Sequence, residues 1–114
     1  MPANIYDIIC EQGTTFTRVV TYKDAAGNPV NLTSYTARMK VRSSRGASGF
    51  YLTLTNSQGI SLESNGEIEI VIPATVTAKV PAGSYKYDLE IVSSSGVVIR
   101  VIEGDFKVSG EVTR

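Results

Sequence analysis

The chain has 114 residues, of which 42% are apolar and 19% are charged, so it can form one globular domain whose core needs no disulfide or metal. Its 11 basic and 11 acidic residues cancel, which argues against a nucleic-acid partner because nucleic-acid-binding proteins carry a basic excess. The lack of histidine excludes Ser-His-Asp and Cys-His catalytic sites and the common zinc ligand sets. We expect a single β-sandwich domain over residues 1–114.

The first ten residues, MPANIYDIIC, contain neither a basic segment nor a long apolar run. They do not resemble a signal peptide, and no stretch approaches the roughly 18 apolar residues of a membrane helix, so we expect no membrane partner. The one cysteine, Cys10, excludes an intrachain disulfide and fits synthesis in a reducing compartment. Because Cys10 follows Ile8 and Ile9, we expect a buried structural thiol rather than a nucleophile.

Alternation of apolar and polar residues predicts strands over residues 14–23, 35–42, 50–55, 67–72 and 85–91. Arg18 is the one charged residue at an inward position. The apolar inward positions are Phe16, Val20, Tyr22, Tyr35, Ala37, Met39, Val41, Phe50, Leu52, Leu54, Ile68, Ile70, Ile72, Tyr85, Tyr87, Leu89 and Ile91. One apolar and one polar face per strand is typical of a β-sandwich, and a slip of one residue would expose the whole apolar set.

Segments rich in glycine, proline, serine and asparagine separate these strands and predict turns. In the first of them, Gly27-Asn28 can supply the positive φ values of a tight turn, and Leu32 is expected to close the edge of the sandwich. Residues 73–80, PATVTAKV, differ because Pro73 can open a helical turn and Pro81 ends it. We predict a two-layer antiparallel sandwich with one short helix that crosses between the sheets.

The segment 84–109 predicts a C-terminal hairpin, and its loop length decides which residues are opposite. A loop of two or four residues would place Arg100 opposite Leu89 on the core face. A three-residue loop that ends at Gly96 keeps the apolar faces matched. Its pairs are Ser93–Val97, Ile91–Ile99, Glu90–Arg100 and Leu89–Val101. In this register Ile99 and Val101 face the core from odd positions, whereas Phe106 and Val108 face it from even positions. One extra residue must therefore lie between them, and we expect a β-bulge at Gly104.

Five acidic residues are candidates for paired glycosidase carboxylates or for a calcium site: Glu63, Glu67, Glu69, Asp88 and Glu90. Alternation places most of them on solvated strand faces, where their pKa values would stay ordinary. Their spacing also lacks the dense Asp/Asn loop of calcium sites. We expect no enzymatic activity, no catalytic, cofactor-binding or metal-binding residues, and no cofactor.

Charged residues are unevenly distributed along the chain. Arg38, Lys40, Arg42 and Arg45 form a basic run, and Glu63, Glu67 and Glu69 form an acidic run. Two interpretations are open. The runs can be ordinary solvated faces, or they can belong to a dipolar subunit whose basic edge meets the acidic edge of a neighbour. Such head-to-tail contacts can close into rings.

The six tyrosines raise the question of carbohydrate binding, because sugars stack on exposed aromatic rings. Tyr22, Tyr35, Tyr85 and Tyr87 fall on predicted core faces, whereas the positions of Tyr6 and Tyr51 are open. Core packing is therefore the better interpretation for four of them. Two or three coplanar exposed tyrosines would favour a sugar-binding surface instead.

Several sequence segments resemble those of a known family. In chain order they are Gln12-Gly13-Thr14-Thr15-Phe16; Tyr22-Lys23-Asp24 with Gly27-Asn28-Pro29-Val30-Asn31-Leu32-Thr33; Tyr35-Thr36-Ala37-Arg38-Met39; Pro81-Ala82-Gly83; Tyr85-Lys86-Tyr87-Asp88-Leu89; and Ser95-Gly96-Val97-Val98. From about residue 5 to residue 109, the chain resembles the family of tailed-phage virion proteins with an immunoglobulin-like β-sandwich, which includes the L-shaped tail fibre collar protein. These are turn and core residues, so they specify the fold better than the task.

The resemblance implies a two-layer antiparallel immunoglobulin-like β-sandwich and a non-enzymatic structural protein of the virion. Such a protein would be an adaptor at the tail, collar or neck that assembles in an oligomeric ring and docks tail fibres or neighbouring virion proteins. Its partners would be tail tube, neck or fibre proteins and further copies of itself, as a homo-oligomer. It would be synthesised in the host bacterial cytoplasm and reside in the virion. The alternative is a carbohydrate- or peptide-binding β-sandwich module, and the resemblance carries over no binding residue.

Overall fold

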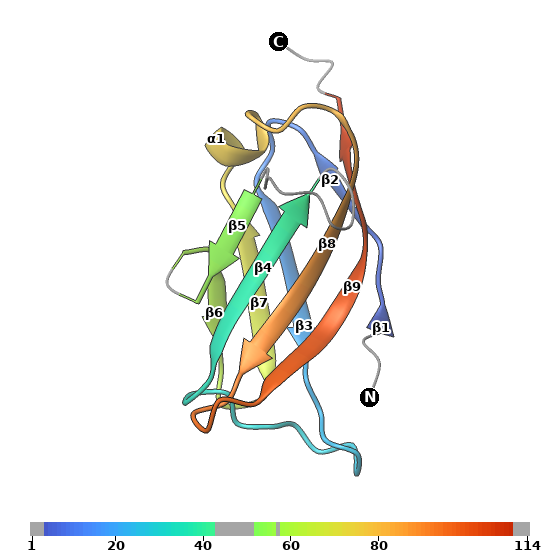
Figure 1. Cartoon of the computed structure of the whole chain (residues 1–114). Helices are drawn as coiled ribbons and strands as arrows, with labels where there is room; N and C mark the ends of the chain where they lie inside the picture. The colour runs from blue at the N-terminus through green and yellow to red at the C-terminus, as the bar shows by residue number, and fades with distance from the viewer. Residues whose placement is uncertain (1–3, 43–51, 57, 111–114) are drawn as a thin grey trace.

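The structure, a computed structural model, describes residues 4–42, 52–56 and 58–110. Its strands form two facing sheets (Figure 1). Sheet A contains β1 (Asn4–Ile5), β2 (Ile8–Glu11), β4 (Thr36–Arg42), β5 (Leu52–Thr55), β8 (Gly83–Val92) and β9 (Val98–Ser109). Sheet B contains β3 (Phe16–Thr21), β6 (Ile60–Leu62) and β7 (Glu67–Ile72), and α1 (Ala74–Thr77) joins β7 to β8. The predicted immunoglobulin-like sandwich with one short helix near residues 73–80 is confirmed.

The core lies between the sheets and is built from the alternating positions. The order of sheet A is β1-β9-β8-β4-β5, with β2 also on β9, and the order of sheet B is β3-β7-β6. Predicted inward residues that are buried include Phe16, Ala37, Met39, Val41, Leu54, Ile68, Ile70, Ile72, Tyr85, Tyr87, Leu89 and Ile91. Val20, Tyr22, Tyr35 and Leu52 are partly buried against this core, and Phe50 lies outside the described residues.

The N-terminal strands depart from the expected antiparallel pattern. β1 and β2 pair in parallel with β9, whereas the other strand pairs are antiparallel. Ile8 and Cys10 on β2 enter the core and are each 1% exposed. The parallel direction is possible because these strands come from the two ends of the chain and no short hairpin has to link them.

The β8–β9 hairpin has the predicted three-residue loop. Ile91 lies opposite Ile99 and Glu90 lies opposite Arg100, while the Ser93 amide donates to the Val97 carbonyl. Leu89, however, pairs with Ile102 and not with Val101, because the register shifts between Leu89 and Glu90.

The predicted bulge at Gly104 is therefore wrong. Gly104 lies in an unbroken ladder opposite Tyr87, and the extra residue is Val101, which is buried together with Ile102. A bulge at Gly104 would have placed Glu103 on the core face opposite Tyr87. The earlier bulge keeps Glu103 on the outer face, where its carboxylate lies 3.6 Å from Arg100 Nη1.

The turn after β3 is organised by one carboxylate. Asp24 Oδ1 accepts hydrogen bonds from the amides of Ala26 and Asn28, and Gly27 has a φ of 88°. The expected positive φ at Asn28 is wrong, because among the described residues positive φ values occur only at glycines. Leu32 is fully buried, as expected for a residue that closes the sandwich edge.

The segment between β7 and β8 is fixed by two hydroxyl groups. Buried Thr77 donates to the Thr14 carbonyl at 2.7 Å and accepts from the Gly13 amide at 3.1 Å, which ties α1 to the β2–β3 turn. The Tyr85 hydroxyl donates to the carbonyl of Pro81, four residues upstream. This second contact is the tyrosine corner of immunoglobulin-like sandwiches, and it aligns the start of β8.

Candidate assembly surface

The outer face of sheet A is a flat array of charges. Alternation on β4, β8 and β9 directs every second side chain away from the core, and the strand register aligns these side chains across the sheet. The rows are Arg38–Glu90–Arg100, Lys40–Asp88–Glu103 and Arg42–Lys86–Asp105. Each row combines both signs, so the face is a mixed-charge surface rather than a uniformly basic one.

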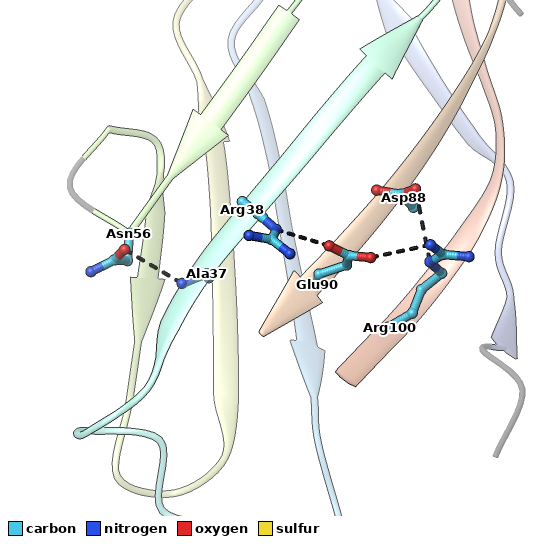
Figure 2. A network of polar contacts seen from close by, with 6 residues as sticks. All are labelled: Ala37, Arg38, Asn56, Asp88, Glu90 and Arg100. Atoms are coloured by element: carbon cyan, nitrogen blue, oxygen red, sulfur yellow. Dashed lines mark hydrogen bonds and ion pairs between the residues drawn. The ribbon is translucent and has the colours of Figure 1, made fainter. Parts of the chain in front are cut away.

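Glu90 is the centre of the best-defined part of this array (Figure 2). Its Oε1 accepts from Arg38 Nε at 2.8 Å, and its Oε2 accepts from Arg100 Nη2 at 3.1 Å. Arg100 also approaches Asp88, with 3.8 Å between Nε and Oδ2. One carboxylate on β8 therefore links β4 to β9 through side chains, across the middle of the sheet.

The two arginines determine the electrostatics of Glu90. Burial alone would raise the pKa of its carboxyl, but hydrogen bonds from Arg38 and Arg100 and their positive charges together lower it. The hydrogen bond with Glu90 in turn raises the pKa of Arg100. Both arginine side chains are almost half exposed, so each pair contributes at most about 1 kcal/mol to stability.

The basic run and the acidic run lie on opposite outer faces of the sandwich. Arg38, Lys40 and Arg42 project from β4 in sheet A, and Arg45 lies outside the described residues. Glu67 and Glu69 belong to β7, the middle strand of sheet B, and Glu63 precedes that strand. The runs are thus features of two faces rather than of two edges, and part of the basic run is already paired within its own sheet.

The acidic candidates do not form one site. Asp88 and Glu90 are on β8 in sheet A, whereas Glu67 and Glu69 are on β7 in sheet B, with the core between them. Among the residues that the structure describes, no group of three His, Cys, Asp or Glu side chains is placed to hold a metal ion. The described part of the chain also contains no helix that is long and apolar enough to cross a membrane.

Cys10 and the tyrosines lie mainly in the core. Burial raises the pKa of the Cys10 thiol, and the charge of Glu11 raises it further, so the thiolate is disfavoured. Tyr85 and Tyr87 are buried and Tyr22 and Tyr35 are partly buried, as predicted, while Tyr51 lies outside the described residues. Tyr6 is 37% exposed and lies over the Arg18 guanidinium at 5.8 Å.

A cluster around Tyr6 joins the N-terminal strands to the sandwich, and no pattern in the sequence predicted it. The Tyr87 hydroxyl donates to the Tyr6 carbonyl, and the Asp105 amide donates to Asp7 Oδ1 at 2.9 Å. Burial is the largest cause that raises the pKa of Tyr87. Arg18 lies 5.2 Å from the Phe16 ring, which explains how a charged residue fits an inward position of β3.

The opposite lateral edge of the sandwich has an apolar groove of about 560 Å³. It opens between β5, β6 and the chain around α1, and its apolar lining is Leu52, Leu54, Ile60, Val71, Pro73 and Val76. None of the described residues that line it is aromatic. Sequence reasoning missed this groove because β6 has three residues, too few to show alternation.

No protein-family model and no curated protein matches the chain. Among solved structures, the extracellular domain of the voltage-gated sodium channel β4 subunit is 10% identical with a TM-score of 0.45, and the match covers 98% of this chain and 97% of that chain. SGBP-B from Bacteroides ovatus, solved with a mixed-linkage heptasaccharide, is 17% identical with a TM-score of 0.45 over 99% of this chain and 25% of that chain.

CopC from Methylosinus trichosporium OB3b is 16% identical with a TM-score of 0.41, over 68% of this chain and 66% of that chain. The chain therefore spans less than two thirds of CopC and a quarter of SGBP-B. At these TM-scores the likenesses indicate no ligand or partner for this chain. Within the residues that the structure describes, the chain is a β-sandwich with a mixed-charge outer face on sheet A, an acidic outer strand on sheet B, and lateral strands that pair on one side only.

Proposed function

We propose that the chain is a structural adaptor of a tailed-phage virion, which assembles in an oligomeric ring at the tail, collar or neck and docks tail fibres or neighbouring virion proteins. The observation that carries the proposal is the position of the residues that resemble this family. Leu32, Met39, Tyr85, Tyr87 and Leu89 are buried, so the resembling residues are those that build the sandwich.

The same holds for the turn residues of the resemblance. Gln12 Nε2 donates to the Val80 carbonyl at 2.9 Å, and the Gly13 amide donates to the Thr77 hydroxyl. Gly27 has the positive φ that the turn after Asp24 requires. The resemblance is spread over core and turn positions, so it concerns the whole domain and supports a shared architecture. We propose that the structural role is shared as well.

Face-to-face stacking of copies is the contact that the charges favour. The outer face of β7 carries Glu67 and Glu69, while the outer face of β4 carries Arg38, Lys40 and Arg42. The β7 strand of one copy can therefore meet the β4 strand of the next with complementary charge, although the rest of the sheet A face is mixed in sign. Because the two faces differ, this contact is head-to-tail and closes into a ring if the rotation between copies permits it.

Two measurements test the proposal. Light scattering coupled to size exclusion, over a range of protein concentrations, should give a defined oligomer, and mass spectrometry of purified virions should detect the chain. A chain that stays monomeric at high concentration and is absent from purified particles would refute the adaptor function.

A charge swap tests the electrostatic contact separately. Reversing Arg38 alone would also break its bond to Glu90, so Glu67→Lys with Glu69→Lys is the cleaner change. We expect this variant to lose the oligomer, and we expect Lys40→Glu with Arg42→Glu in the same chain, which leaves the Arg38–Glu90 bond in place, to restore it. Unchanged assembly in the glutamate variant would show that the acidic run is only a solvated face.

The second candidate function is a carbohydrate- or peptide-binding module, and the apolar groove at the β5–β6 edge is the observation that favours it. Its described lining offers aliphatic surface with a rim of Thr53, Asn56, Gln58 and Ser61. A glycan array and a peptide array on the purified chain separate this function from the adaptor function. Specific binding that is lost in Val76→Asn, at a partly buried position of the lining, in a chain that remains monomeric, would favour the module.

A further inference from the structure

The lateral edge formed by β1 and β2 has a strand side that is open to a partner (Figure 1). Within the described residues, β2 pairs with β9 and with no other strand. An open strand edge presents backbone donors and acceptors that can pair with another chain. The question is which residues of β2 present them, and what strand they would accept.

The hydrogen bonds to β9 identify the outward-facing backbone groups. The Tyr6 amide donates to Glu103 O at 2.8 Å, and the Gln12 amide donates to Ser109 O at 2.9 Å. In a parallel pair, every second residue bonds to the same neighbour, so Ile8 and Cys10 also direct their backbone groups to β9. The N–H and C=O groups of Asp7 and Ile9 therefore point to the open side.

The side chains of the same residues form an alternating row on the surface. Ile5 is 69% exposed and Ile9 is 65% exposed, and exposed Asp7 and Glu11 alternate with them. On the neighbouring strand, Asp105 is paired with Lys86, and Lys107 lies beside Ile9. Two large apolar side chains on an open edge are unusual, because soluble proteins normally protect such edges with charges or proline.

The acidic side chains of Asp7 and Glu11 disfavour pairing of this edge with the same edge of a second copy. If β2 paired antiparallel with β2 of a second copy around Ile9, Asp7 of each copy would lie opposite Glu11 of the other. Like charges directly opposite on paired strands are destabilising. A strand that offers basic residues at these positions, with apolar residues between them, would instead match both the charges and the isoleucines.

We propose that the β1–β2 edge binds an extended segment of a partner protein by adding it as a further strand of sheet A, and that one face of this segment carries basic and apolar residues in turn at every second position. The backbone of Asp7 and Ile9 supplies the ladder hydrogen bonds, Ile5 and Ile9 contact the apolar residues, and Asp7 and Glu11 contact the basic ones. The inference goes beyond the adaptor function and holds whether or not the chain forms a ring.

A synthetic peptide, acetyl-Thr-Lys-Thr-Val-Thr-Lys-Thr-amide, places Lys, Val and Lys on one face of the strand and is a direct probe. Fluorescence anisotropy of a labelled form measures its binding to the full chain. We expect it to bind about tenfold or more tightly than the version with glutamate for lysine, and than a rearranged version that moves the lysines to the face opposite the valine. Hydrogen exchange should show new protection of the Ile9 amide in the complex. Equal binding of the three peptides, or no binding of the basic one, would overturn the proposal.

Proline at the edge tests the ladder itself. Ile9→Pro removes an N–H that does not bond to β9, so the fold should persist while binding of the basic peptide falls about tenfold or more. Thr53→Pro is the matched control on the β5 edge. Because Asn56 N bonds to Ala37 O, the alternating pattern directs the Thr53 N–H away from β4 as well. Undiminished binding by Ile9→Pro, or an equal loss in Thr53→Pro, would overturn the proposal.

A second variant separates binding from folding. Glu11→Lys should weaken the basic peptide and strengthen the acidic one, a reversal of preference that loss of structure cannot produce. A basic peptide that binds Glu11→Lys as tightly as it binds the unaltered chain would contradict the proposed charge contact. A dimer that forms without peptide and that Ile9→Pro abolishes would assign this edge to self-association instead.

Discussion

Glu90 is more buried than the two arginines that bind it: its side chain is 16% exposed, against 46% for Arg38 and 48% for Arg100. The flanking guanidinium groups cover the carboxylate and also compensate its charge. Because of this geometry, substitution of Glu90 should change the stability of the protein, whereas most residues on the outer face of a sandwich tolerate substitution. The pH dependence of stability should reveal the difference.

We predict that Glu90→Gln lowers the free energy of unfolding at pH 7 by about 1–2 kcal/mol and has little effect near pH 3. The folded-state pKa of Glu90 is lowered, so its contribution is present above the unfolded pKa and is lost as the pH falls through the folded one. Urea unfolding at a series of pH values measures this. Exposed Glu69→Gln is the control, and an effect of Glu90→Gln that is constant with pH would contradict the assignment.

At the level of elements, the β1–β2 segment depends on a glycine in β9. A Cβ at Gly104 would lie 2.7 Å from Asp7 Oδ1 and 2.8 Å from the Tyr6 carbonyl oxygen. The backbone between β1 and β2 thus approaches β9 more closely than a side chain would allow. This approach is also what places the Tyr6 carbonyl within reach of the Tyr87 hydroxyl.

We predict that Gly104→Ala lowers stability by about 1–3 kcal/mol and increases hydrogen exchange at the Tyr6 amide, because the N-terminal strands are pushed from β9. Gly83→Ala is a matched control, since Gly83 has a φ of 154°, close to the 157° of Gly104, but a Cβ there meets nothing within 4 Å. If the two variants lose equal stability, backbone conformation rather than crowding would be the cause.

At the scale of the whole molecule, both sheets share one core. Ile70 on β7 and Leu89 on β8 are both fully buried, and they belong to different sheets. The contacts between the sheets are therefore what each sheet needs to bury its apolar face. Neither sheet can unfold without exposing the apolar face of the other sheet.

We predict that Ile70→Ala and Leu89→Ala each destabilise the protein by about 2–5 kcal/mol, and that each variant still unfolds in a single transition. Circular dichroism and tyrosine fluorescence during urea unfolding should give coincident curves. Val19→Ala, at an exposed position of β3, should change stability by less than about 0.5 kcal/mol. Separate transitions for the two probes would contradict a shared core.

The amino-acid sequence by itself determined which face of each alternating strand is buried, where the helical turn lies, and the loop of the last hairpin. These features are local: alternation assigns faces with a period of two, and loop length sets the first pairs of a hairpin. Tyr85, Tyr87, Leu89 and Ile91 are buried for this reason. Even the need for one extra residue in β9 followed from the sequence, because the apolar core-facing positions change from odd to even numbers along that strand.

Only the tertiary structure decided the remaining features. The bulge lies at Val101, where pairing along the whole of β8 places it, and because it precedes Glu103 it keeps that residue outward. The parallel pairing of β2 with β9 joins residues that are about a hundred positions apart, so no local pattern encodes it. The Glu90 network, the groove beside β5 and the open edge at Ile9 all depend on which strands become neighbours. Strand adjacency is settled by burial of the complete core, and alternation within one strand carries no information about it.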